Sequence, residues 1–205
     1  MIRVLLADDH NIVREGLRRL LAAAGDIEVA GEAADGDRAL ALVKANDYDV
    51  AMLDLSMPGL SGMDLIKRLR IEKPKLRILV LSMHGEKQYA ARALKAGASG
   101  YLNKDIAGEQ LLGAIRKIAA GGVHIGEAAA ASLVSSGEKS GHEKLSDREF
   151  EVLRLLVEGL GPSGIGERLH LSVKTVSTHK TRILEKLDLK STADLVRYAI
   201  ENKLL

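Results

Sequence analysis

The first half of this sequence places three carboxylates, a hydroxyl and an ammonium group directly after separate apolar runs: Asp8, Asp9, Asp54, Ser82 and Lys104. Carboxylates that converge in one crevice repel one another unless a cation lies between them. Mg²⁺ prefers such hard oxygen ligands, and a lysine and a hydroxyl beside it can hold phosphoryl oxygens. A carboxylate can also be the nucleophile that forms an aspartyl phosphate. Asp54 is the best candidate, because the turn SMPG after it exposes its side chain.

A parallel sheet would bring these side chains together. Short apolar runs alternate with helix-period segments, the order that gives parallel βαβ units. The expected strands are residues 2–7, 27–33, 48–53, 76–82 and 100–102, and the expected helices are residues 11–24, 36–45, 61–72, 86–96 and 107–119. Nearly continuous apolar strands indicate a sheet covered on both faces. We therefore predict an α/β domain over residues 1–120 with its ligands at the carboxyl edge of the sheet.

The composition changes after AAGG, and the rest of the chain reads as helical. Residues 121–144 are expected to form a linker, with a short helix over 128–134. Residues 145–205 are expected to form an all-α domain. Its signals are the capping box SDRE, the expected N-cap Ser172 before a helix that ends near residue 187, and the sequence STAD before the last helix.

Bulk composition limits the classes of protein that fit. The chain has 205 residues, a formal net charge of +2 and no cysteine, which excludes disulfides and thiolate metal sites. No apolar run approaches the ~20 residues that span a bilayer, and the start MIRVLLADDH does not resemble a secretory signal. We expect a soluble, cytoplasmic protein without membrane association.

The segments LLADDH, MLDLSMPGLSG, ILVLSMHG and GASGYLNKD, in this order, resemble the receiver domain of two-component response regulators. The resemblance implies a flavodoxin-like, five-stranded parallel sheet of order 2-1-3-4-5. It also implies the following roles: Asp54 as phosphoacceptor; Asp8, Asp9 and Asp54 as Mg²⁺ ligands; Ser82 as the switch hydroxyl; Lys104 as the lysine that pairs with the phosphoryl group; and Tyr101 as the aromatic switch residue.

The resemblance also bears on neighbouring residues of the same segments. The resemblance favours Asp9 over Asp8 as the direct Mg²⁺ ligand. His10 is expected to belong to the helix start rather than to the metal, because Mg²⁺ prefers oxygen. Ser56 and His84 stand where the family lines the path of the hydrolytic water, so the resemblance implies that they tune the lifetime of the phosphoryl group.

The segments LSDREFEVLRLL, HLSVKTVSTHKTRILEKL and LVRYAI resemble the helix-turn-helix output domain of the LuxR/FixJ type. Residues 174–190 hold five Lys or Arg against two acidic residues, a local basic patch of the kind that binds DNA. The resemblance places base reading at Ser177, Thr178 and Thr181. The expected phosphate contacts are Lys174, Thr175, Lys180 and Arg182. For His179 we expect a packing role.

The segment GPSGIGERL departs from this pattern, in which the family has a sequence of the kind NKEIAERL. Gly164 and Gly166 each cost about 1 kcal/mol relative to alanine inside a helix. We expect the helix to start near Ser163 and to fray easily, which would make the DNA-binding domain only marginally stable. Hydrogen exchange of residues 163–169 in the free protein tests this hypothesis.

Taken together, the sequence predicts a phosphorylation-switched transcription regulator rather than a classical enzyme, although the receiver can catalyse its own phosphorylation and dephosphorylation. The expected partners are a sensor histidine kinase, double-stranded DNA and a second copy of the chain when phosphorylated, with Leu195 and Tyr198 as guesses for the dimer contact. One alternative is a phosphatase of the haloacid-dehalogenase class. That class needs an acid two residues after the nucleophile, where this chain has Ser56. The other alternative, a vestigial receiver, conflicts with the intact set of polar residues.

Overall fold

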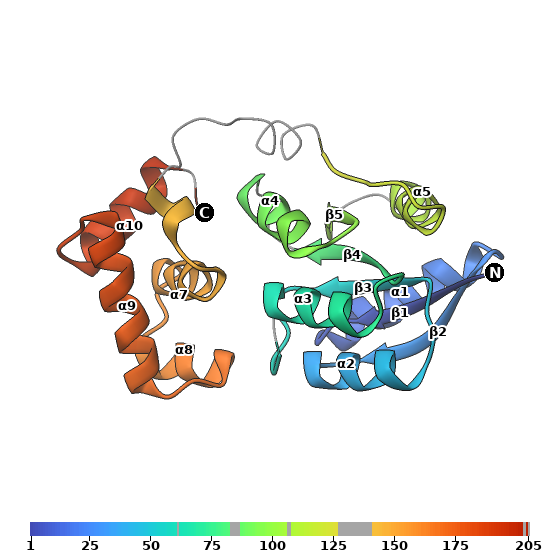
Figure 1. Ribbon diagram of the computed structural model, residues 1–205, viewed down its shortest axis with the longest axis horizontal. Coiled ribbons are helices and arrows are strands. Elements are labelled where there is room, and N and C mark those ends of the chain that lie inside the picture. Colours follow the sequence, from blue (N-terminus) through green and yellow to red (C-terminus); the bar gives the residue numbers. More distant parts are fainter. Residues whose placement is uncertain (61, 83–86, 106–107, 127–140, 203, 205) are drawn as a thin grey trace. The chain divides into compact units, whose positions relative to one another are not determined.

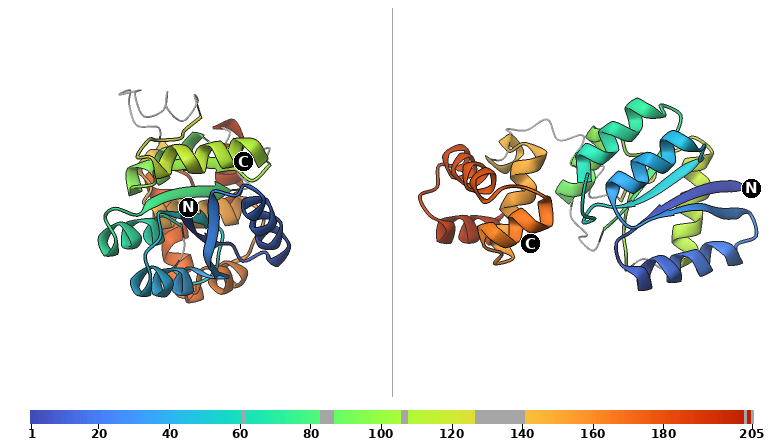
Figure 2. Two further views of the ribbon diagram at one scale, coloured as in Figure 1. Left: turned by 90° about the vertical axis from the view of Figure 1, so that its right-hand side faces the viewer. Right: turned by 90° about the horizontal axis from the view of Figure 1, so that it is seen from below.

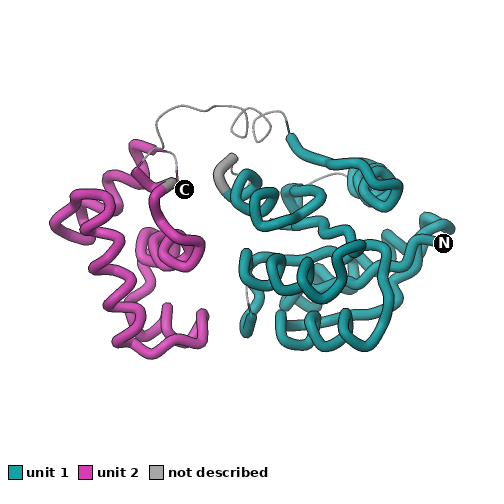
Figure 3. Tube along the Cα trace, in the orientation of Figure 1, with its two compact units in different colours: residues 1–134 teal, residues 135–205 magenta. Residues whose placement is uncertain are grey.

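In the computed structural model of the protein (Figure 1), the chain is described except for residues 61, 83–86, 106–107, 127–140, 203 and 205. The chain divides into two compact units, Met1–Val134 and Ser135–Leu205 (Figure 3). The division falls inside the expected linker. The expected short helix over 128–134 lies outside the described residues.

The first unit is an α/β fold, as the sequence predicts. Its sheet has five parallel strands in the order β2-β1-β3-β4-β5. The strands are β1 (Ile2–Ala7), β2 (Ile27–Ala33), β3 (Val50–Asp54), β4 (Arg77–Ser82) and β5 (Gly100–Asn103). The helices are α1 (Asn11–Ala23), α2 (Gly36–Ala45), α3 (Gly62–Glu72), α4 (Lys87–Ala96) and α5 (Gly108–Ala119).

Helices lie on both faces of this sheet (Figure 2). Alternate strand residues, such as Val4 and Met52, form one buried cluster with Leu21 of α1 and Ile115 of α5. The central strand β3 is buried along its whole length, so its residues are covered on both faces of the sheet. Burial on both faces explains why the strands read as continuous apolar runs, and it confirms that prediction.

The strand that carries Asp54 is shorter at its start than the expected range of 48–53. The carboxylate of Asp49 accepts a hydrogen bond from the Arg3 amide at 2.8 Å, and the Asp49 amide donates to the Arg3 carbonyl at 2.9 Å. Asp49 thus ties the entry of β3 to β1 before the regular ladder begins. The strand then continues through Asp54, so the carboxylate stands on the last residue of the strand rather than after it.

After α5, the chain returns to the edge of the sheet. The Tyr101 amide donates to the His124 carbonyl, and the His124 amide donates to the Ser99 carbonyl, both at 3.0 Å. These bonds cover part of the free edge of β5, which is otherwise open to pairing with another strand. The start of the expected linker is therefore held against the strand that contains Tyr101.

The second unit is helical, as predicted. It contains the 3₁₀ turn η1 (Gly141–Lys144) and the helices α7 (Asp147–Val157), α8 (Pro162–Leu169), α9 (Val173–Leu187) and α10 (Thr192–Glu201). Ser146 and Glu149 form the predicted capping box at the start of α7. Ser172 and Ser191 cap α9 and α10 by accepting backbone amide hydrogen bonds.

The two residues expected at a dimer contact differ in exposure: Leu195 is buried and Tyr198 is partly buried. Leu195 is 0% exposed, so its side chain belongs to the helical core and the guess is wrong for this residue. The Tyr198 hydroxyl lies 3.1 Å from the His142 amide, which donates to it, and 3.0 Å from His142 Nδ1. Tyr198 therefore fastens η1, the end of the expected linker, to α10.

The helix α8 forms despite its two glycines, beginning at Pro162 after the N-cap Gly161. The two glycines differ in their surroundings. A Cβ on Gly166 would lie 2.7 Å from the Leu171 carbonyl oxygen, which is too close. A Cβ on Gly164 would meet only Leu160 side-chain atoms, at 3.8 Å or more.

We therefore expect Gly164→Ala to stabilise the second unit by up to about 1 kcal/mol, because alanine has less conformational entropy to lose. Gly166→Ala is the matched control and should bring no gain, since the chain after the helix must shift to admit the new methyl group. Amide hydrogen exchange across α8 measures both effects. Equal protection in the two variants would contradict this account of the glycines.

Candidate functional site

The carboxyl edge of the sheet collects the polar residues that the sequence singled out. Asp8 follows β1, Asp54 ends β3, Ser82 ends β4, and Lys104 follows β5. Asp8, Asp54 and Ser82 are buried, so the expectation that the SMPG turn exposes the Asp54 side chain is wrong. The parallel register explains this convergence, because the ends of adjacent strands stop at the same edge.

Lys104 joins two of the carboxylates. Its Nζ lies 2.7 Å from Asp8 Oδ2 and 2.7 Å from Asp54 Oδ2, and only 5% of its side chain is exposed. Burial alone would lower the pKa of Lys104, but hydrogen bonds and charge attraction from Asp54 and Asp8 outweigh it and raise the pKa. The Lys104 amide also donates to the Ser82 carbonyl at 2.8 Å. The ammonium group is thus fixed between Asp8 and Asp54.

Local hydrogen bonds fix the two carboxylates from the other side. Asp8 Oδ1 accepts from the His10 amide at 2.9 Å, and Asp54 Oδ1 accepts from the Ser56 amide at 3.0 Å. Arg14, one turn into α1, donates to the Asp8 carbonyl at 2.6 Å. Sequence reasoning missed Arg14. The sequence feature that could have indicated this role is the position of Arg14, a basic residue about one helical turn after Asp8 and Asp9.

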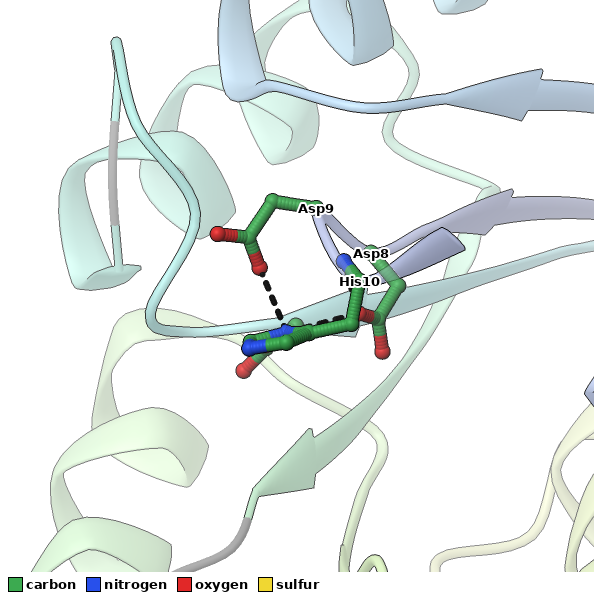
Figure 4. A group of neighbouring side chains, drawn as sticks. Asp8, Asp9 and His10 are labelled. Carbon is green, nitrogen blue, oxygen red and sulfur yellow. Dashed lines mark hydrogen bonds and ion pairs between the residues drawn. The ribbon is translucent and has the colours of Figure 1, made fainter. Parts of the chain in front are cut away.

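Asp9 and His10 complete the cluster (Figure 4). His10 Nδ1 lies 2.9 Å from Asp9 Oδ1 and 3.3 Å from Asp8 Oδ1. The His10 carbonyl accepts the first hydrogen bond of α1 from the Arg14 amide, so the residue does start the helix as expected. Its ring also covers the acidic pair, which the sequence did not predict.

The arrangement fits a divalent cation. Ligand atoms of Asp8, Asp9, His10 and Asp54 all lie within 4.8 Å of one another. The buried oxygens Asp8 Oδ2 and Asp9 Oδ1 are approached by Lys104 Nζ at 2.7 Å and by His10 Nδ1 at 2.9 Å, and each oxygen has a second lone pair. Carboxylate oxygens with unused lone pairs are the ligands that Mg²⁺ takes.

The other residues expected near this site are placed differently. Tyr101 is buried in β5 beside Val80 of β4. Ser56 is partly buried and contributes its amide to Asp54. His84 lies outside the described residues.

Helix α9 carries the residues expected to contact DNA. Its buried face holds Val176, Ile183 and Leu187. The exposed residues among the expected contacts are Lys174, Ser177, Thr178, Thr181 and Arg182, while Thr175 and Lys180 are partly buried. His179 is partly buried too, and this burial lowers its pKa, in keeping with the expected packing role.

Glu149 of α7 holds this helix in place. Its Oε2 accepts hydrogen bonds from Lys186 Nζ at 2.7 Å and from the Ser146 amide at 2.7 Å. Burial acts to raise the pKa of Glu149, but the bonds from Lys186 and Ser146 together outweigh it and lower the pKa below 4.5. One buried carboxylate thus caps α7 and anchors α9.

A pH dependence follows from this lowered pKa. The stabilisation from Glu149 is complete above its unfolded pKa and is lost as the pH falls through its lower folded pKa. We expect protection of α9 amides against hydrogen exchange to fall as the pH drops below the ordinary pKa of a glutamate, and Glu149→Gln to make this fall smaller. The same fall in both proteins would show that other groups cause it.

The fold and the two sites define a class: a receiver domain followed by a helix-turn-helix DNA-binding domain. The response regulator receiver domain family matches residues 4–116, and the luxR family of bacterial regulatory proteins matches residues 143–199. The chain belongs to the two-component response regulators of the NarL/FixJ type. It is a transcription regulator and not a classical enzyme.

Relatives cover the whole chain. The oxygen regulatory proteins NreC of Staphylococcus haemolyticus and of Staphylococcus carnosus are each 39% identical to it over 215 residues, covering 100% of this chain and 99% of theirs. The structure of RcsB from Salmonella enterica serovar Typhimurium, bound to promoter rprA in the presence of the phosphomimetic BeF₃⁻, is 31% identical and covers 96% of this chain and 97% of its own, with a TM-score of 0.70.

A single domain matches as well. The receiver domain of the response regulator NarL from Mycobacterium tuberculosis is 40% identical and covers 58% of this chain and 97% of its own, with a TM-score of 0.57. Among the described residues, the helices are all too short or too polar to cross a bilayer.

Proposed function

We propose that this protein takes a phosphoryl group onto Asp54 from a sensor histidine kinase, with Mg²⁺ held by Asp8, Asp9 and Asp54, and that this step controls dimerisation and DNA binding. The observation that carries the proposal is the buried pair of Asp8 and Asp54 joined by Lys104. Lys104 Nζ contacts one oxygen each of Asp8 and Asp54, and a carboxylate has about four lone-pair sites, so lone pairs remain for a second cation. The site therefore has room for further positive charge.

Each residue of the site has a separate role in the proposed phosphoryl transfer. An Asp54 carboxylate oxygen forms the new bond to phosphorus, and the phosphohistidine nitrogen of the kinase is the leaving group. The Ser56 amide, 3.0 Å from Asp54 Oδ1, orients the nucleophile. Mg²⁺, when bound, supplies positive charge next to the transferred phosphoryl oxygens. Lys104 Nζ is 2.7 Å from Asp54 Oδ2, so its ammonium group can pair with an oxygen of the phosphoryl group once that group is bound to Asp54.

The switch begins at the neighbouring strand ends. We propose that the Ser82 hydroxyl turns toward the phosphoryl group and that Tyr101 moves with it. The Tyr101 amide is bonded to the His124 carbonyl, and the Lys104 amide to the Ser82 carbonyl. A movement of β4 or β5 is therefore passed to the beginning of the linker. Such a local charge change can bias a two-state surface.

The output is DNA binding through α9. We propose phosphate contacts from Lys174, Thr175, Lys180 and Arg182 and base contacts from the three exposed hydroxyl residues. A dimer would present two such helices to a two-fold site. One RcsB structure is described as two RcsB dimers bound to two parallel DNAs, and a dimer is accordingly the assembly proposed for this chain.

The decisive experiment treats the full chain with acetyl phosphate and Mg²⁺ and measures its mass, its oligomeric state and its affinity for duplex DNA. We expect one added phosphoryl group, more dimer and tighter DNA binding. No mass gain would overturn the receiver mechanism. A mass gain without any change in DNA affinity would overturn the switch.

Salt dependence tests the proposed phosphate contacts. Lys174→Ala should weaken binding to all duplexes alike and reduce the slope of log affinity against log salt by about 1, since one fewer counterion is released. Lys75→Ala, an exposed lysine of the first unit, is the control and should leave the slope unchanged. An unchanged slope for Lys174→Ala would place this lysine outside the interface.

A further inference from the structure

The exposed face of α9 that we propose to read bases is made of short polar side chains. Thr178 and Thr181 are exposed and lie one turn apart, with Ser177 beside them. Glu185 follows Thr181 by a further turn on the same face and is also exposed. All four side chains carry oxygen atoms, the two threonines also carry a methyl group, and none of the four carries an N–H donor.

Each hydroxyl on this surface already uses its one hydrogen. Ser177 Oγ donates to the Val173 carbonyl at 2.9 Å. Thr178 Oγ1 donates to the Lys174 carbonyl at 3.0 Å, and Thr181 Oγ1 donates to the Ser177 carbonyl at 3.1 Å. A hydroxyl has one donor and two acceptor lone pairs. In this arrangement the three oxygens can only accept hydrogen bonds from a ligand in the groove.

The helix backbone also fixes the threonine methyl groups. A threonine in a helix populates only a few χ1 rotamers, and the bond to the preceding turn selects one of them. The methyl groups are thus held in place next to their acceptor oxygens. The surface of Thr178 and Thr181 pairs a hydrogen-bond acceptor with an apolar group on each residue.

Base pairs differ in what they offer to such a surface. Adenine presents its N6 amino donor in the major groove, and its partner thymine presents a C5 methyl group. Guanine presents only the acceptors N7 and O6, which would face the acceptor oxygens of α9. Cytosine offers an amino donor but lacks the methyl group. An A·T pair therefore satisfies both halves of the surface, whereas a G·C pair offers the cytosine amino donor but no methyl group.

We infer that α9 reads A·T base pairs through Ser177, Thr178 and Thr181, by accepting from adenine amino groups and packing threonine methyls on thymine methyls. This inference rests on the proposed DNA-binding function and specifies its ligand. Lys174 and Arg182 flank the surface and supply the donors for phosphate oxygens.

The first experiment selects duplexes from a random library with the full chain, with and without acetyl phosphate. We expect enriched sites with A·T pairs at the positions whose preference changes in Thr178→Val and Thr181→Val, variants that keep the methyl group and lose the oxygen. Thr192→Val in α10 is the control and should select the same sites as the wild type. Guanine at the positions that respond to these variants would overturn the inference while leaving DNA binding intact.

The second experiment separates the methyl contact from the hydrogen bond. Deoxyuridine in place of thymine at a responsive position should weaken wild-type binding about fourfold, the effect of one buried methyl group. Thr178→Ser or Thr181→Ser keeps the oxygen and should remove this difference at its own position. Equal binding of thymine and deoxyuridine duplexes by the wild type would overturn the methyl contact. Enrichment of no duplex at all would overturn the proposed function itself.

Discussion

Asp54→Asn is expected to abolish phosphoryl uptake completely. Asparagine keeps the shape of the side chain and its hydrogen bond from the Ser56 amide, but its amide is not a nucleophile. Treatment with acetyl phosphate and Mg²⁺ should add one phosphoryl group to the wild type and none to the variant, as measured by mass. The DNA affinity of the variant should be the same with and without acetyl phosphate.

The matched control for this experiment is Asp64→Asn. Asp64 is an exposed carboxylate in the first turn of α3, so its loss changes the net charge equally without touching the site. It should take up the phosphoryl group like the wild type. A mass gain in Asp54→Asn would place the phosphoacceptor elsewhere, and loss of uptake in both variants would point to charge alone. Either result contradicts the proposed role of Asp54.

The second large effect concerns stability. Lys104→Met removes the ammonium group that lies 2.7 Å from both Asp8 Oδ2 and Asp54 Oδ2. Two buried carboxylates are then left without their cation, which costs about 3–5 kcal/mol of unfolding free energy. Methionine has a long unbranched apolar side chain, so the loss comes mainly from charge rather than from a cavity. Urea unfolding in the presence of a chelator measures it.

Added Mg²⁺ should then reverse part of this loss. A ligand that binds only the folded state stabilises it by about 2.7 kcal/mol at 100 times its dissociation constant. In Lys104→Met the cation would meet two carboxylates that no lysine neutralises, so Mg²⁺ should stabilise the variant more than the wild type. Lys73→Met is the control: Lys73 pairs with the exposed carboxylate of Asp47, and its loss should cost at most about 1 kcal/mol.

Two outcomes of this experiment would contradict the arrangement. Equal losses in Lys104→Met and Lys73→Met would mean that the buried bridge contributes no more than a surface pair. Equal stabilisation of wild type and Lys104→Met by Mg²⁺ would mean that the cation and Lys104 do not act on the same carboxylates.

Much of the fold and the main part of the receiver site follow from the sequence alone. Local apolar periodicity predicts the alternation of strands and helices. The carboxyl ends of parallel strands meet at one edge of the sheet. The convergence of Asp8, Asp54 and Ser82 therefore follows without a structure. The caps Ser146 and Ser172 are equally local, because a capping side chain bonds to an amide only a few residues away.

Contacts between distant segments were decided only by tertiary packing. The sequence brings Lys104 to the correct edge but does not say that its Nζ lies equally close to Asp8 and Asp54. It does not reveal that Glu149 anchors α9 through Lys186. Helical periodicity puts Leu195 on an apolar stripe without saying what covers that stripe, and the structure buries it in the core of its own unit. The physical reason is that side-chain pairing depends on where separate elements pack, whereas periodicity and capping depend only on near neighbours.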